Sequence, residues 1–82
     1  MDLEIESLLF KRVEKPKNHL FTKVINLWEN RYRINVYIEI EEDNLIKKRI
    51  SASYFCHYNN GKLQIMQESD YTGPEIKKKQ GL

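Results

Sequence analysis

Residues 31–42 constrain the fold more than any other part of the chain, because apolar and polar side chains alternate there without interruption. The apolar members are Tyr32, Ile34, Val36, Ile38 and Ile40. Successive side chains on a strand point to opposite sides of a sheet, so a period of two predicts a strand with one buried face. Residues 46–58 repeat the pattern. We therefore predict a mainly β fold, an antiparallel meander of three to five strands that forms a small open barrel or a sheet.

The dipeptide Asn60-Gly61 predicts a tight turn after residues 46–58, because a type I′ turn needs positive φ at both central positions. The returning strand is expected over residues 62–67. The resulting cross-strand pairs are Tyr58 with Leu63 and Cys56 with Ile65. Both pairs are apolar and lie on one face, so the turn and the alternation agree on the register.

The hairpin before it is expected to turn through a three-residue loop at residues 43–45. The pairs that this loop produces are Ile38 with Ile50, Val36 with Ala52, Glu39 with Arg49 and Glu41 with Lys47. Apolar pairs then share one face and opposite charges share the other. Cross-strand pairs of these kinds favour the register.

Residues 18–28 allow two interpretations. As a helix, the segment has an apolar stripe and a candidate N-cap at Asn18. As a strand, it is rich in the residues that suit a sheet, and Thr22, Val24 and Ile25 would lose rotamer freedom in a helix. The strand is favoured, and the helix is kept as the alternative.

Residues 2–13 contain Ile5, Leu8 and Leu9 at helical spacing, with acidic side chains in the first turn, where the helix dipole favours them. A short helix is therefore expected here. If residues 18–28 are also helical, the fold is α+β with one or two short N-terminal helices.

Composition restricts the cellular setting and the number of domains. Cys56 is the only cysteine among the 82 residues, whereas small secreted domains usually carry several paired cysteines. An intracellular protein, cytoplasmic or nuclear, is expected. No apolar stretch approaches the roughly 20 residues that span a bilayer, so no membrane partner is expected.

We predict a single domain over residues 1–68. Residues 69–82, with Pro74, two glycines and three consecutive lysines, are predicted to form a mobile basic tail.

Residues that carry chemistry are sparse. Cys56 and His57 are adjacent, and neighbours on a strand point to opposite faces, so they do not share a metal site. The three glycines are scattered rather than gathered in a phosphate-binding loop. The acidic residues 41–43 lack the ligand spacing of a calcium loop. We expect no catalytic, cofactor-binding or metal-binding residues, and a protein that is not an enzyme.

The outward side of the predicted sheet carries a candidate binding face in which aromatic and basic side chains interleave. Its members are Arg33, Tyr37, Lys47, Arg49, Phe55 and Met66. The predicted register places Phe55 opposite both Arg33 and Met66. Single-stranded nucleic acid binds such surfaces by stacking bases on rings while cations hold the phosphates. Alternatively, residues 2–13 or a partner subunit cover this face, and Phe55 and Met66 then belong to the core.

Two kinds of function are compatible with these features. The first is a protein-interaction module that binds a protein partner or itself, as a small adaptor, an inhibitor or a homodimer subunit. The second is an accessory domain that binds single-stranded nucleic acid through the aromatic–basic face. The near-balanced net charge of +2 favours the first, and the interleaving of arginines with rings favours the second.

Overall fold

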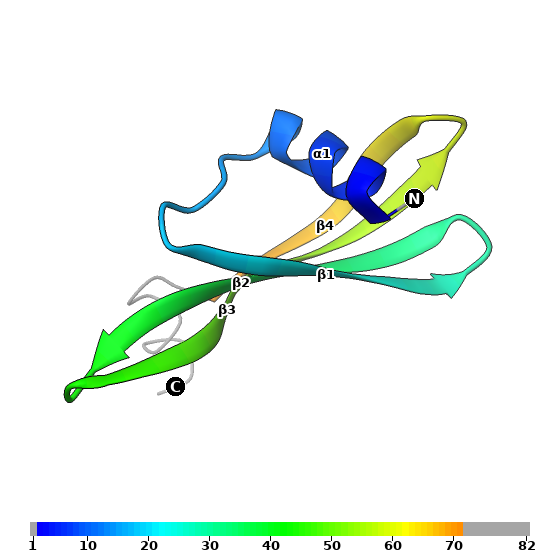
Figure 1. The fold of residues 1–82 in the computed structure, drawn as a ribbon. Helices are drawn as coiled ribbons and strands as arrows, with labels where there is room; N and C mark the ends of the chain where they lie inside the picture. Colours follow the sequence, from blue (N-terminus) through cyan, green and yellow to red (C-terminus); the bar gives the residue numbers. More distant parts are fainter. Residues whose placement is uncertain (1, 72–82) are drawn as a thin grey trace.

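A computed structural model describes residues 2–71 of the chain as one helix followed by four strands. The elements are α1 (Asp2–Arg12), β1 (His19–Trp28), β2 (Arg31–Glu42), β3 (Leu45–Asn59) and β4 (Lys62–Asp70). The strands form one antiparallel sheet in the order β1-β2-β3-β4, so each strand pairs with the next one in the chain (Figure 1). The predicted mainly β meander is confirmed, as an open sheet with a single short N-terminal helix.

The segment after residue 18 is strand β1, so the favoured strand prediction is confirmed and its helical alternative is wrong. One boundary differs from the prediction. Strand β4 continues through Ser69 and Asp70, which the sequence had assigned to the tail. The rest of that predicted tail, residues 72–82, lies outside the described residues.

Helix α1 covers one face of the sheet and forms the core with it (Figure 1). Ile5 and Leu9 are fully buried, one helical turn apart, against the apolar side of the central strands. The core residues of the sheet are Tyr32, Ile34, Val36, Ala52, Tyr54, Cys56 and Leu63. We call this side the helix face and the opposite side the outer face. Within residues 2–71, no helix has the length and apolar character needed to cross a membrane.

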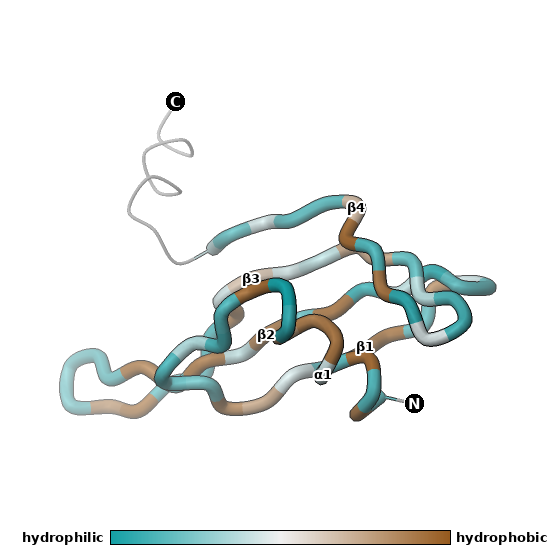
Figure 2. The backbone as a smooth tube through the Cα atoms, turned by 90° about the horizontal axis from the view of Figure 1, so that it is seen from above, coloured by the Kyte–Doolittle hydropathy of each residue, from teal (hydrophilic) through white to brown (hydrophobic). Residues whose placement is uncertain are grey.

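The alternation seen in the sequence separates the two faces of the sheet. Every second residue of β2 from Tyr32 to Ile38 is buried, and the residues between them are only partly buried. Apolar and polar stretches accordingly alternate along the strands in Figure 2. The pattern of period two therefore decides which side of the sheet receives α1.

The turns follow the expected backbone chemistry at one hairpin and differ at the other. Asn60 and Gly61 have φ values of 53° and 76°, and the predicted pairs Tyr58↔Leu63 and Cys56↔Ile65 are confirmed. The β2–β3 hairpin turns instead through two residues, Asp43 and Asn44, with φ values of 55° and 66°. Asp and Asn tolerate this left-handed conformation better than most residues, so a tight turn forms where a three-residue loop had been predicted.

A β-bulge at Ser51 reconciles this turn with the core. Val36 pairs with Ala52 as predicted, but Tyr37 pairs with Ile50, so Ser51 has no counterpart in β2. The pairs predicted beyond this point are wrong, because every partner moves by one residue. The observed pairs are Ile38↔Arg49, Glu39↔Lys48, Ile40↔Lys47 and Glu41↔Ile46. The two-residue turn and the apolar pattern demand registers that differ by one residue, and the bulge absorbs the difference.

Three further register shifts occur, two in β1 at Leu20 and Leu27 and one in β4 at Met66. Met66 was predicted to lie opposite Phe55, and that pairing is wrong because Phe55 pairs with Gln67. Bulges bend a strand and increase its local twist. The sheet in Figure 1 is accordingly strongly twisted, and the β2–β3 hairpin extends away from α1.

Candidate functional site

The outer face is the surface that the described part of the fold leaves uncovered. Residues 2–13 were one predicted cover for it, but α1 packs on the opposite side. Large rings on the outer face are exposed to solvent, with Phe21 39% and Trp28 51% accessible. Monomeric proteins leave few large apolar side chains together on a surface without a binding role. The outer face is therefore the candidate site.

The structure brings together only part of the predicted binding face. Arg33 pairs with Phe55, and Tyr37 lies four residues after Arg33 on β2. An even spacing along a strand places side chains on the same side, so these three residues share the outer face. Lys47 and Arg49 do not join them, because beyond the Ser51 bulge their pairing partners belong to the helix face. Met66, at its own bulge in β4, is 47% exposed but does not face Phe55.

Two rings and a lysine form one end of the outer face, which we call the Phe21 station. Phe21 of β1 pairs with Tyr37 of β2, and their rings stack with centroids 4.6 Å apart at an interplanar angle of 27°. The Lys48 ammonium lies over the Phe21 ring, 5.5 Å from its centroid. Lys48 reaches this side because the bulge moves it to the position that Arg49 had been predicted to occupy, opposite Glu39.

The other end, the Trp28 station, gathers Trp28, Arg31, Phe55 and His57. The ring centroids of Trp28 and Phe55 lie 6.2 Å apart, and those of Phe55 and His57 lie 5.9 Å apart in a T-shaped arrangement. The Arg31 guanidinium lies 5.3 Å from the centroid of the Trp28 ring. Stacked and cation–π contacts of this type hold exposed rings in defined positions.

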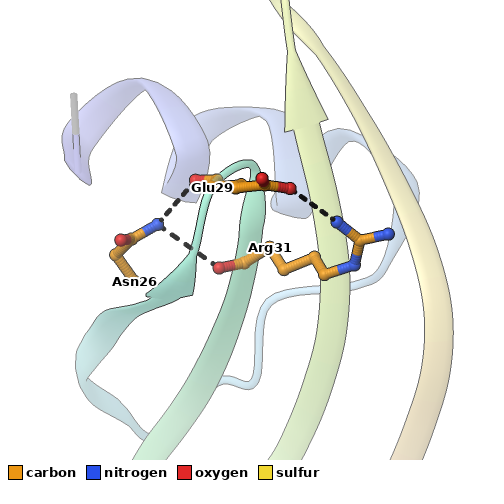
Figure 3. A network of polar contacts seen from close by, with 3 residues as sticks. All are labelled: Asn26, Glu29 and Arg31. Carbon is orange, nitrogen blue, oxygen red and sulfur yellow. Dashed lines mark hydrogen bonds and ion pairs between the residues drawn. The ribbon is translucent and has the colours of Figure 1, made fainter.

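The turn between β1 and β2 fixes the geometry of this station (Figure 3). The Asn26 amide donates to the backbone carbonyls of Glu29 and Arg31 at 3.1 and 3.3 Å. The Arg31 guanidinium lies 3.6 Å from the Glu29 carboxylate. Because Glu29 is exposed, this ion pair adds little stability, but together these contacts set the strand end that carries Trp28.

Between the two stations lies a hydrogen-bonded group that we call the polar centre: Arg33, Asn35 and Ser53. Arg33 donates to the Ser53 hydroxyl at 3.1 Å, and that hydroxyl donates to the Asn35 side-chain oxygen at 2.7 Å. Ser53 is only 5% exposed, although it lies on the face opposite the core. The polar side chains above Ser53 therefore sit in fixed positions rather than moving freely in solvent.

Charge is divided between the two sides of the sheet. Along β2 from residue 31 to 37, the outer-face residues and their cross-strand partners include Lys23, Arg31 and Arg33 and, among the described residues, no Asp or Glu. Arg31 is paired with the Glu29 carboxylate of the adjoining turn, so Lys23 and Arg33 are the cations of the stretch without a carboxylate beside them. The first acid on this face along β2 is Glu39, opposite Lys48. A cationic surface with exposed rings favours an anionic ligand that has flat, apolar parts.

A hollow on the helix face carries the opposite charge. This hollow of about 340 Å³ beside the end of α1 is lined by Glu14, Glu68 and Asp70 together with Phe10 and Tyr54. Burial, followed by the charges of Glu68 and Asp70, raises the pKa of the Tyr54 phenol. An anionic ligand is therefore directed to the outer face and not to this hollow.

Cys56 and His19, two titratable groups of the helix face, are packed against neighbouring residues. Cys56 is fully buried, and burial raises the pKa of its thiol to about 11. His19 contacts the Thr22 hydroxyl at 2.7 Å and lies 3.8 Å from Glu6. Burial and the Lys15 charge lower its pKa, against a smaller opposing effect of Glu6. Among residues 2–71, no three His, Cys, Asp or Glu side chains are placed to hold a metal ion.

Sequence reasoning missed most of the residues that complete the outer face. They are Phe21, Lys23, Trp28, Arg31, Asn35, Lys48 and Ser53. For β1 the sequence already indicated Glu29-Asn30 as the turn into the next strand, and extending the register from that turn, which sets Trp28 opposite Arg31, would have found its members of the outer face. Lys48 was hidden by the bulge, which the local alternation does not reveal.

No protein-family model matches the chain, and no curated protein or solved structure matches it significantly.

Proposed function

We propose that the protein is a non-catalytic binding module that holds single-stranded nucleic acid on the outer face of its sheet. One observation carries the proposal: two groups of rings, one with the exposed Phe21 and the other with the exposed Trp28, flank a stretch of sheet positions that carries Lys23 and Arg33 and no Asp or Glu among its described residues. Rings provide stacking surfaces for any base, and lysine or arginine binds the phosphates. The ligand of this face is therefore a flexible polyanion with aromatic units.

The spacing of the stations favours an unstacked single strand over a duplex. Tyr37 and Arg33 are four residues apart on β2, and Phe55 lies opposite Arg33. At about 3.3 Å per residue, the stations are roughly 13 Å apart along the strands. Stacked bases repeat about every 3.4 Å. Bases on the two stations are therefore not stacking neighbours, and the strand between them lies over the polar centre.

The stacking contribution is tested with Trp28→Ala, measured by fluorescence anisotropy with a labelled mixed-sequence single strand of about 12 nucleotides. We expect affinity to fall by the equivalent of about 1–3 kcal/mol, since one stacking surface is lost. The salt dependence of binding should stay unchanged, because a ring displaces no counterion. Leu3→Ala is the matched control, as Leu3 is an 81% exposed apolar residue on α1, on the opposite side of the sheet.

The charge contribution is tested with Lys23→Gln, because Lys23 is exposed on the outer face opposite Asn35. The slope of log affinity against log salt should decrease by about 0.7, the share of one phosphate contact to a single strand. Lys11→Gln, an equal charge change on α1, should leave the slope unchanged. An intact protein that shows no binding up to about 100 µM at low salt, the weak end of non-specific affinities, would end the proposal.

A specific observation also favours a protein-interaction module as a second candidate. The tip of the β2–β3 hairpin extends away from α1, and its side chains Leu45 and Ile46 are 59% and 70% exposed (Figure 1). Two exposed apolar side chains next to the charged turn at this tip suit a protein partner or a second copy of the chain. Analytical ultracentrifugation of the protein and of Ile46→Lys tests self-association: a dimer that the substitution dissociates supports this candidate, and a monomer at all concentrations removes the homodimer.

A further inference from the structure

The polar centre lies where a nucleotide between the two stations would rest, so its hydrogen-bonding groups face the edge of a base. Arg33 and Asn35 are adjacent outer-face residues of β2, and Ser53 joins them from β3. This inference rests on the proposed function, because it concerns which bases a site for single strands prefers. Base edges differ in donors and acceptors, and this difference is the means of discrimination.

The hydrogen bonds within the group determine which atoms remain for a ligand. The Ser53 hydroxyl accepts from Arg33, so its own proton needs an acceptor, which is the Asn35 side-chain oxygen at 2.7 Å. The Asn35 oxygen and the Ser53 oxygen each keep one lone pair, while both N–H groups of the Asn35 amide stay available to a ligand. Arginine has donors only. The polar centre therefore presents more donors than acceptors.

We propose that the polar centre makes the protein select single strands of uracil, thymine or guanine over adenine, because these bases present a carbonyl oxygen where adenine presents its N6 amino group. Uracil offers its two carbonyl oxygens and guanine its O6 and N7 acceptors, which a guanidinium contacts in pairs. Adenine places its N6 amino donor beside N7. A donor surface meets that amino group with a donor and leaves both groups unpaired.

Comparison of uracil with adenine is the most informative, because stacking works against the proposed preference. A purine has the larger ring system and gains more from the two aromatic stations than a pyrimidine does. Rings alone would therefore hold an adenine strand at least as tightly as a uracil strand. A preference for uracil requires hydrogen bonds to the base edge.

The test measures the affinities of labelled oligouridylate and oligoadenylate, each about 12 nucleotides long, for the intact chain and for Arg33→Lys. The intact chain should bind the uridylate about tenfold more tightly, within the range of one bidentate base contact. Arg33→Lys keeps the charge and therefore the salt slope, but it loses the planar fork, so the ratio should fall to about one or below. Arg31→Lys, the same change at the Trp28 station, should keep the ratio.

Ser53→Ala gives a second measurement if Arg33→Lys lowers the melting temperature. Without the hydroxyl, the Asn35 oxygen is released and can accept from adenine N6, so the uridylate preference should decline while the positive charge is unchanged. A ratio near one in the intact chain, or the same ratio in Arg33→Lys, would overturn the inference and leave the proposed function standing. Absence of binding to both strands would overturn the two together.

Discussion

Replacement of Leu9 by alanine tests whether α1 is held on the helix face as the structure shows. Leu9 is fully buried in the core that α1 forms with the central strands. Removal of three methyl or methylene carbons from such a site leaves a cavity, and Leu→Ala changes of this kind cost about 2–5 kcal/mol. Helix propensity changes little and in the favourable direction, so packing alone decides the result.

The matched control is Leu3→Ala on the same helix, where the side chain is 81% exposed. The chemistry and the propensity change are the same, so the difference between the variants isolates burial. Leu3→Ala should stay within about 0.5 kcal/mol of the parent protein. In a domain of this size each kcal/mol moves Tm by roughly 4–8 °C, so Leu9→Ala should lower it by at least about 8 °C.

Thermal unfolding followed by circular dichroism, with urea unfolding as a second measure, gives both values. If Leu9→Ala and Leu3→Ala unfold at the same temperature, α1 does not pack on the sheet. The assignment of one covered and one uncovered face would then fail, and with it the basis of the candidate site. A large loss confined to Leu9→Ala supports the packing independently of any ligand.

Three further changes test the hairpin turn and the two titratable groups. Gly61→Val should destabilise the protein by about 1–3 kcal/mol, because Gly61 has a φ of 76° that β-branched residues avoid; an unchanged melting temperature would refute the type I′ turn. Cys56 should resist iodoacetamide at pH 8 in the folded protein and react in urea, since the thiol is buried and its pKa is raised to about 11; rapid alkylation of the folded protein would contradict this. The pKa of His19 is lowered from 6.5 by burial, so just below that pH the unfolded chain binds more protons than the folded protein, and Tm should fall on acidification. His19→Gln should flatten the plot of Tm against pH in this range. An identical plot for the variant would exclude His19 as the source of the pH dependence.

The alternation of residues 31–42 was sufficient to predict β2, its buried face and the order of the neighbouring strands. Local sequence carries this information because the period of two acts within one strand. The Asn60-Gly61 turn was predictable for the same reason, since positive φ is a property of the residues themselves. Each of these features depends on neighbours in the sequence.

The candidate site was harder to predict, because its membership depends on register between strands. Lys48 joins the outer face, and Lys47 and Arg49 leave it, only because Ser51 adds a residue to β3. Alternation within β3 does not show this, since a bulge is a relation between two strands. The contribution of β1 was missed because residues 18–28 suit a helix and a strand almost equally, and contact with β2 decides between them.

The bulge at Ser51 has a consequence that an ordinary strand would not share. Loss of one residue within a strand normally turns every later side chain to the opposite face. Here Ile50 already belongs to the outer face and Ala52 to the helix face. Joining them directly restores simple alternation, keeps the Asp43-Asn44 turn, and leaves all pairs on both sides of the bulge in place. The deletion would remove the 2.9 Å hydrogen bond that the Tyr71 backbone amide donates to the Ser51 carbonyl.

Deletion of Ser51 should therefore be tolerated, at a cost of about 0.5–1.5 kcal/mol for that hydrogen bond. Deletion of Asn35 in β2 is the matched control, because it makes Ile34 and Val36 neighbours and sends Val36 and Ile38 to the outer face. These two residues are 1% and 6% exposed, and full exposure of such side chains costs about 1.5–3 kcal/mol each, a large part of the stability of a small domain. Thermal melts of both variants decide the matter. Equal losses would show that the Ser51 register shift is not present, and that Lys48 does not share a face with Phe21.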